Sequence, residues 1–213
     1  MLTIYGNKHS GNSNRVVYTA ELLGLEYSFR EMDFQKDLKT EWFLKIHPAG
    51  KVPALDDDGF ALFESVAMCK YLCAKAAGGG GDAATASAAL YPSGIRERAL
   101  VDQWIDFSIQ HVGGAMYKIM GAKVYGPLRG KPVDEAAVAE GQQFLDRFLP
   151  IIEAQLGKQG HLASGQLTLA DVVLLSVLDA AKRAEVNLSG YPNLIAWRTK
   201  LQDMAFWKKA QAE

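Results

Sequence analysis

The polar loop between Tyr5 and Arg15 carries the first side chains in this sequence whose types and spacing suit chemistry. Ser10, Asn12 and Ser13 each offer a hydrogen-bond donor there, between a short apolar strand pattern and a helical one. Loops at the carboxyl ends of strands in α/β sheets are favoured places for ligands. No histidine and carboxylate stand at a spacing that would make one of these serines a nucleophile. The loop therefore predicts a ligand site in which no serine is deprotonated.

A second candidate site lies where the run Phe63-Glu64-Ser65 joins a strand to a helix. The N-terminus of a helix exposes unpaired amides and a partial positive charge, so it can receive a carboxylate, with the Ser65 hydroxyl as a further donor. The same residues also suit a structural role, in which Ser65 caps the helix and Glu64 favours its dipole. Residue types alone support the two interpretations equally.

A third candidate is the run Lys51-Val52-Pro53, where a proline stands at the start of a strand pattern. A strand tolerates proline at its first residue because the missing amide does least damage there. A cis Val52–Pro53 bond is the alternative, since X-Pro bonds adopt that form at modest cost. It would turn the Val52 backbone outward, toward a ligand. Taken alone, the run favours the strand-edge interpretation.

These three segments fall in a first region, 1–76, in which strands alternate with helices. Strands are expected over 2–5, 27–29, 52–55 and 61–63, and the run of three aspartates and a glycine at 56–59 predicts a hairpin. A helix is expected to begin at Asn12 or Ser13 as N-cap and to stop at Gly24, and another covers 64–76. The segment 38–46 reads as an irregular or helical crossover. This order predicts a small mixed α/β sheet with helices packed on its faces.

The composition changes at residues 77–93, which are rich in glycine and alanine and are expected to form a linker or surface loop. Beyond it, no strand signal returns over 94–213. Apolar spacing predicts helices over 95–120, with a weak point at Gly113-Gly114, over 136–156, from Thr168 onward, and over 193–201. Thr168 and Asp171 fit a capping box, which is a structural device. The second region is therefore expected to be an all-helical domain.

Composition excludes several classes of protein. The 213 residues carry 23 basic and 24 acidic side chains, a net charge of −1, which argues against a nucleic-acid partner held by phosphate neutralisation. No apolar run approaches the roughly 18 residues of a membrane helix, and the four apolar residues before the first polar turn are too few for the core of a signal peptide, so a cytoplasmic protein is expected. Cys69 and Cys73 do not match a Cys-x-x-Cys motif and are expected to be reduced core residues. No metal site is expected.

Four motifs, in this order and spacing, resemble those of cytosolic glutathione transferases: the loop with Ser10 and Arg15, the segment 48–55, the run 63–65, and the run 168–171. The resemblance covers essentially the whole chain. The loop looks most like the serine-type branch, of which the phi and theta classes are examples, in a bacterial-type form. The resemblance implies a thioredoxin-like domain, an all-helical second domain and a homodimer.

The resemblance also implies a chemical role for Ser10. In the family, the matching hydroxyl donates a hydrogen bond to the sulfur of glutathione, which favours the thiolate and so supplies the nucleophile at neutral pH. Asn12 and Ser13 lie close enough in the sequence to be alternative sulfur contacts. The enzyme would form no covalent bond with its substrate, which agrees with the absence of a triad.

The glutathione molecule itself would be held from its glycyl carboxylate to its γ-glutamyl end. Leu38 stands where phi and theta members commonly have a histidine, so the part of the carboxylate contact that this histidine makes is not expected here. The residues expected to bind glutathione are Lys39, Lys51, Val52, Pro53, Glu64 and Ser65.

The second substrate is expected between the Ser10 loop and the first helices of the second domain. Soft aromatic and thioether side chains would line that pocket, although the helix core accounts for at least half of them. The candidates are His111, Met116, Tyr117 and Met120. The predicted function is a detoxifying transferase whose glutathione thiolate attacks a small hydrophobic electrophile. Glutathione-dependent disulfide or peroxide reduction, and a non-catalytic ligand-binding protein of this fold, are the alternatives.

Overall fold

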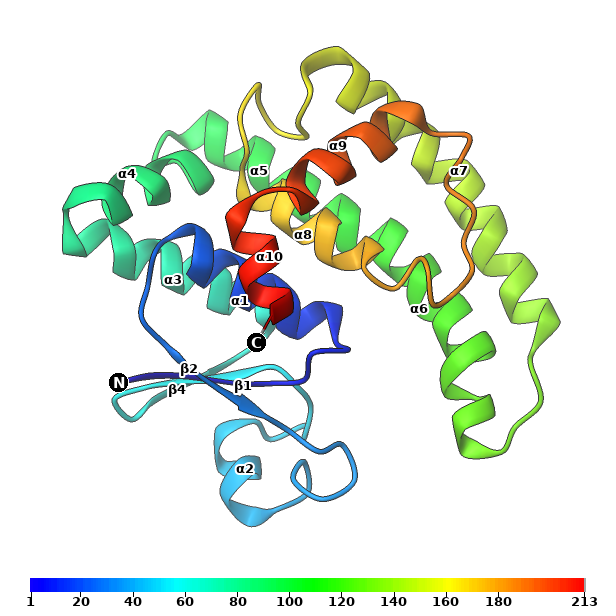
Figure 1. The fold of residues 1–213 in the computed structure, drawn as a ribbon, viewed down its shortest axis with the longest axis horizontal. Coiled ribbons are helices and arrows are strands. Elements are labelled where there is room, and N and C mark those ends of the chain that lie inside the picture. Colours follow the sequence, from blue (N-terminus) through cyan, green and yellow to red (C-terminus); the bar gives the residue numbers. More distant parts are fainter. Residues whose placement is uncertain (213) are drawn as a thin grey trace. The chain divides into compact units, whose positions relative to one another are not determined.

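The computed structural model describes residues 1–212, which divide into two compact units (Figure 1). The first unit comprises Met1–Ser93 and the chain from Met204 onward, and the second comprises Gly94–Asp203. No helix in the described part of the chain is both long and apolar enough to cross a membrane.

The first unit is built on a four-stranded sheet of order β2-β1-β3-β4. Its strands are β1 (Leu2–Gly6), β2 (Ser28–Glu31), β3 (Ala54–Asp57) and β4 (Phe60–Phe63). The β1–β2 pair is parallel, whereas β1–β3 and β3–β4 are antiparallel. Asp58 and Gly59 turn the β3–β4 hairpin with φ of 52° and 91°, the left-handed backbone that a two-residue hairpin needs. The predicted mixed sheet and its hairpin are confirmed.

Helices cover both faces of this sheet. Figure 1 shows α1 (Gly11–Leu22) and α3 (Ser65–Gly79) on one face and the short α2 (Glu41–Ile46) on the other. The core on the α2 side consists of Met32, Leu38, Phe43 and Ala54. The C-terminal helix α10 (Ala205–Ala212) packs on α1, where the Phe206 ring lies 5.6 Å from that of Tyr18. The last helix therefore belongs to the first unit and not, as predicted, to the helical domain.

The predicted linker is also wrong in its conformation. Residues 77–93 form the end of α3 and a further helix, α4 (Gly81–Leu90). Leu90 is buried, and the Ser87 hydroxyl donates to the Cys73 carbonyl at 2.6 Å, so α4 packs against α3. Alanine has the highest helix propensity of all residues, and a single packed face is enough to stabilise a helix in which half of the residues are alanine. The boundary between the units falls after Ser93.

The second unit is helical throughout its regular structure, as predicted. It contains α5 (Ile95–Phe107), α6 (Gly114–Met120), α7 (Glu135–Gln159), α8 (Leu169–Leu178) and α9 (Pro192–Gln202). A π-helical turn over Ser108–Gly113 separates α5 from α6, at the glycine pair where weakness is expected, and a second covers Gly121–Tyr125. A short 3-10 turn, Pro127–Arg129, follows.

The capping box at the start of α8 is confirmed. The fully buried Asp171 carboxylate accepts from the Thr168 amide at 2.9 Å and from its hydroxyl at 3.0 Å. Its second oxygen accepts from the Leu162 amide and the Trp197 indole, both at 3.1 Å, and lies 3.2 Å from the His161 Nδ1. Asp171 therefore ties the start of α8 to the preceding loop and to α9, which the sequence pattern does not reveal.

The two cysteine thiols are expected to be inert in the folded protein. Cys69 and Cys73 are both unpaired and buried, and burial raises their pKa values to about 11 and about 12. Because the thiolate is the reactive form, neither cysteine will react with an aromatic disulfide reagent at mildly alkaline pH. The absorbance of the released thiol should appear only after denaturant is added, with two equivalents per chain. Rapid labelling of the native protein would contradict this.

Candidate active site

The three candidate segments of the sequence meet at one edge of the sheet. In the strand register, Tyr5 lies beside Ala54, and Ala54 lies beside Phe63. The residues that continue from these three positions are Gly6, Pro53 and Glu64, so the loop after β1, the turn before β3 and the start of α3 share that edge. Helices α1 and α3 both begin there, which directs two positive helix ends toward the same place.

Ser10 is the N-cap of α1, so the helix begins earlier than the predicted caps Asn12 and Ser13. Its hydroxyl oxygen accepts from the Ser13 amide at 3.3 Å, and its own amide donates to the Asn7 carbonyl at 2.9 Å. Ser10 is half-buried, and within the described residues its O–H has no acceptor. The hydroxyl is thus oriented by the helix end while its proton remains available to a ligand.

The two alternative sulfur contacts are placed very differently. Ser13 is fully buried, and its hydroxyl accepts from the Asn7 amide at 3.1 Å, which serves the loop itself. Asn12 is exposed on the first turn of α1. Burial withdraws Ser13 from any ligand, whereas Ser10 and Asn12 stay accessible.

The start of α3 shows that the simple capping interpretation is wrong. Glu64 occupies the N-cap position with φ 70° and makes no side-chain cap bond, and Ser65 is the first helical residue. The Ser65 hydroxyl instead accepts from the Nη1 of Arg15 at 3.2 Å. Arg15 is buried beneath it, on α1. The Arg15 guanidinium therefore stabilises the junction between β4 and α3 through this hydrogen bond. The sequence pattern does not reveal this contact.

Lys39 lies against the turn that precedes β3, in which Lys51 follows Gly50. The Gly50 amide donates to the His47 carbonyl at 2.8 Å, and Gly50 has φ 57°. A Cβ placed on Gly50 would lie 3.1 Å from the Lys39 Nζ, so that ammonium group sits against the residue next to Lys51. The Val52–Pro53 bond that follows is cis, the less favoured of the two forms considered from the sequence.

Replacing Gly50 with alanine is expected to destabilise the protein by about 2 kcal/mol, because the left-handed backbone disfavours a side chain. The new Cβ would also lie 2.5 Å from the Leu38 carbonyl, which must move together with the neighbouring Lys39. Urea unfolding measures the loss of stability.

Gly59→Ala is the matched control for this substitution. Gly59 also has positive φ, 91°, but nothing lies within 4 Å of its Cβ position. It should lose only about 1 kcal/mol of stability. Equal losses of stability in the two variants would contradict a cost of close packing at Gly50.

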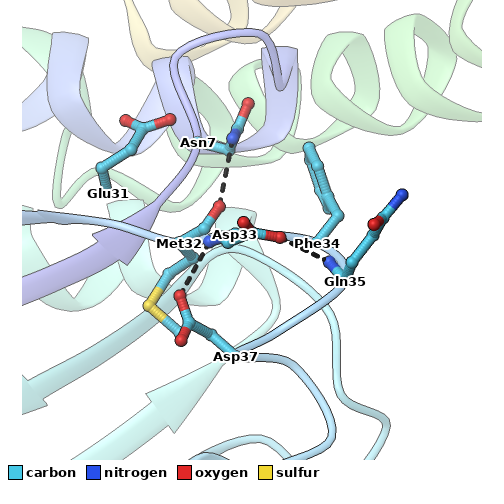
Figure 2. Close-up of a pocket in the computed structure, with 7 residues that line it drawn as sticks. All are labelled: Asn7, Glu31, Met32, Asp33, Phe34, Gln35 and Asp37. Carbon is cyan, nitrogen blue, oxygen red and sulfur yellow. Dashed lines mark hydrogen bonds between the residues drawn. The ribbon is translucent and has the colours of Figure 1, made fainter.

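An open hollow of about 560 Å³ lies beside this edge, where β1 and β2 end (Figure 2). Within it, the Asn7 side-chain amide donates to the Met32 carbonyl at 3.1 Å. Asp33 accepts from the Gln35 amide at 2.8 Å, and these backbone bonds lower the pKa of its carboxyl. The Asp33 carboxylate therefore stabilises the loop. The ring of Phe34, which is 54% exposed, forms an aromatic wall of the hollow. Sequence reasoning missed this loop, although it follows a strand parallel to β1. The lining residues are Asn7, Glu31, Met32, Asp33, Phe34, Gln35 and Asp37.

The predicted electrophile-pocket residues lie in the second unit, where they split into two groups. Met116 and Met120 are buried on α6, as the helix-core interpretation expects. Tyr117 is 76% exposed, and the His111 ring stacks on that of Phe148 with a centroid distance of 4.5 Å. Among the described residues, no group of three or more His, Cys, Asp or Glu side chains is placed to hold a metal ion.

Comparison with known proteins gives consistent matches for both regions. The model for the glutathione S-transferase N-terminal domain matches residues 9–75, and that for the C-terminal domain matches residues 116–203. A probable glutathione S-transferase, GSTF2, from Oryza sativa subsp. japonica is 33% identical over 205 residues, which cover 94% of this chain and 91% of the relative.

Solved structures agree over nearly the full length. Glutathione S-transferase-I bound with lactoylglutathione matches with a TM-score of 0.84 and 31% identity, covering 99% of this chain and 98% of that one. Glutathione transferase F2 from Populus trichocarpa matches with a TM-score of 0.88 and 29% identity, covering 99% and 97%. The predicted thioredoxin-like domain followed by a helical domain is confirmed. On the domain matches and the full-length relatives together, the chain belongs to the glutathione S-transferase family.

Proposed function

We propose that Ser10 activates the thiol of glutathione for attack on small hydrophobic electrophiles. The observation that carries this is the geometry of its hydroxyl, which is fixed by the Ser13 amide and keeps its own proton free at the positive end of α1. A hydrogen bond from that proton to sulfur, together with the helix end, favours the thiolate over the thiol. The transferase activity itself follows from the family to which the chain belongs.

The other segments at this edge of the sheet, which are the turn before β3 and the start of α3, would hold the rest of glutathione. The Val52 backbone beside Pro53 would pair with the cysteinyl part, and Glu64 and Ser65 would bind the γ-glutamyl end. The positive φ of Glu64 and the Arg15 contact to Ser65 support this, since both preorganise the junction. Lys39 and Lys51 would bind the glycyl carboxylate, and the position of the Lys39 Nζ against Gly50, the residue before Lys51, supports this.

The second substrate would be a small apolar compound with an electrophilic atom. In the first unit, the exposed Phe34 ring offers it an aromatic wall near the Asn7–Ser10 turn. The predicted contacts from the second unit are still His111, Met116, Tyr117 and Met120. The exposed Tyr117 and the ring-stacked His111 suit this role better than the two buried methionines.

A comparison of substrates tests this function. The wild-type protein should conjugate chlorodinitrobenzene with glutathione faster than it reduces hydroxyethyl disulfide or cumene hydroperoxide. Faster turnover of the disulfide or the peroxide would favour the reductase alternative. If calorimetry detects no binding of glutathione, the non-catalytic alternative takes its place.

A homodimer is proposed as the working assembly. The first half of α5 supports it, because its apolar residues Ile95 and Leu100 are 87% and 45% exposed. Light scattering should therefore give about twice the chain mass, and Ile95→Glu should shift the protein toward monomer, since a buried unpaired charge is costly. A monomeric wild-type protein would contradict the proposal.

A cytoplasmic location is also proposed, because the chain resembles the cytosolic members of its family. Fractionation of cells that express the protein, followed by immunodetection, tests it. Recovery in a membrane or secreted fraction would contradict it.

A further inference from the structure

His47 is a buried histidine at the point where two arms of the proposed glutathione site come together. These arms are the Lys51–Val52 segment and the Glu64–Ser65 junction. It ends α2, is 4% exposed, and its carbonyl accepts from the Gly50 amide in the turn that leads to Lys51 and Val52. Its ring stacks on Phe63, with centroids 4.8 Å apart and planes 27° apart. Phe63 is the residue directly before Glu64. One residue thus contacts both segments: the backbone carbonyl of His47 contacts the turn before β3, and its ring contacts the chain that enters α3.

A hydrogen bond from the Nδ1 of His47 does not explain why a histidine is buried at this position. Its Nδ1 is buried and has no hydrogen-bond partner among the described residues. Such a nitrogen adds nothing to the stability of the folded state, because its hydrogen bond to water is lost without replacement. An apolar ring of the same shape would stack on Phe63 equally well. What the imidazole adds is the capacity to take up a proton inside the site.

The charges around His47 are those of the proposed glutathione contacts. Burial lowers the pKa of His47, the nearby Glu64 carboxylate raises it, and the Lys51 ammonium lowers it. His47 is therefore uncharged at neutral pH. When it does take a proton, the new cation attracts Glu64 and repels Lys51, so it acts on both arms in opposite directions.

We propose that His47 is a positioning residue of the glutathione site, whose uncharged ring, packed on Phe63, holds the Glu64–Ser65 junction beside the Lys51–Val52 segment. This inference depends on the proposed function, because it assigns a role at the same site. Protonation of the ring places a cation between the two arms and loosens their hold on glutathione. The lowered pKa puts this change below about pH 6.5, the ordinary value for histidine.

The test measures the affinity for S-methylglutathione, which has no thiol to ionise and whose own charges do not change between about pH 7 and pH 5. In the wild-type protein, calorimetry should show the Kd rising as the pH falls below about 6.5 and His47 takes up a proton, by about tenfold once the ring is charged. His47→Phe, which keeps the stacked ring, should bind with nearly the wild-type Kd at neutral pH and change less than about twofold at acid pH. His47→Ala, which loses the ring contact, should bind about five- to tenfold more weakly at neutral pH.

The matched control is His9→Gln, which removes an exposed imidazole from the same unit and should keep the wild-type pH dependence. His47→Phe decides the matter even if the alanine variant fails to fold. The inference is overturned if His47→Phe retains the wild-type pH dependence, or if a folded His47→Ala binds as tightly as the wild type. A wild-type Kd that does not change with pH overturns this inference alone, whereas no binding by the wild type at any pH overturns the proposed function as well.

Discussion

Replacing Ser10 with alanine should lower kcat/KM for conjugation by about a hundredfold to a thousandfold, the usual loss when one preorganised donor to a developing charge is removed. The Ser10 hydroxyl oxygen is held by the Ser13 amide, so its proton is already directed when glutathione arrives. Without it, the bound thiol would keep a pKa nearer its ordinary value, and less thiolate would be present at neutral pH. Steady-state kinetics with chlorodinitrobenzene measures the effect, and calorimetry with glutathione should show little loss of affinity.

Two controls separate this chemistry from the stability of α1. Ser10→Ala also removes the N-cap of that helix, which costs about 1 kcal/mol. Ser10→Thr keeps both the hydroxyl and the cap and should retain most of the activity. Asn12→Ala changes the neighbouring exposed side chain and tests the remaining alternative contact. If Ser10→Ala is as active as the wild type while Asn12→Ala is not, the sulfur contact belongs to Asn12.

Replacing Asp171 with alanine should have the largest effect on stability, a loss of about 3 to 5 kcal/mol, as for other buried charged hydrogen-bond networks. The carboxylate is fully buried and is the shared acceptor for the start of α8, the loop before it and the Trp197 indole of α9. Its removal leaves several buried donors without an acceptor at once, and each carries its own desolvation penalty. Urea unfolding followed by far-UV circular dichroism measures the change.

Single-donor variants give the scale for that loss. Trp197→Phe removes one donor to Asp171 and should cost about 1 to 2 kcal/mol, and Thr168→Ala should cost about 1 kcal/mol. The loss in Asp171→Ala should exceed each of these clearly, because it affects all of the donors together. A loss no greater than that of Trp197→Phe would show that the buried donors find other partners.

Local patterns predicted most of the elements near the site. Short apolar runs marked the four strands, and the run of three aspartates and a glycine at 56–59 marked the hairpin, because only a few residue types adopt the backbone of its turn. The same local reasoning failed at 81–90, where α4 forms on a packing face that exists only after α3 has folded. It also placed the N-cap of α1 at Asn12 or Ser13, since the bond from the Ser13 amide to Ser10 becomes visible only in three dimensions.

The sequence by itself determined that the chain has an α/β region followed by helices, and which polar segments were candidates for a site. These are properties of short stretches, since side-chain period, turn residues and caps act over a few residues. Only the tertiary structure decided that Gly6, Pro53 and Glu64 share one edge, that Arg15 supports Ser65, and that His47 packs on Phe63. The physical reason is that these contacts join residues far apart along the chain, and strand register and packing, which no local pattern encodes, bring them together.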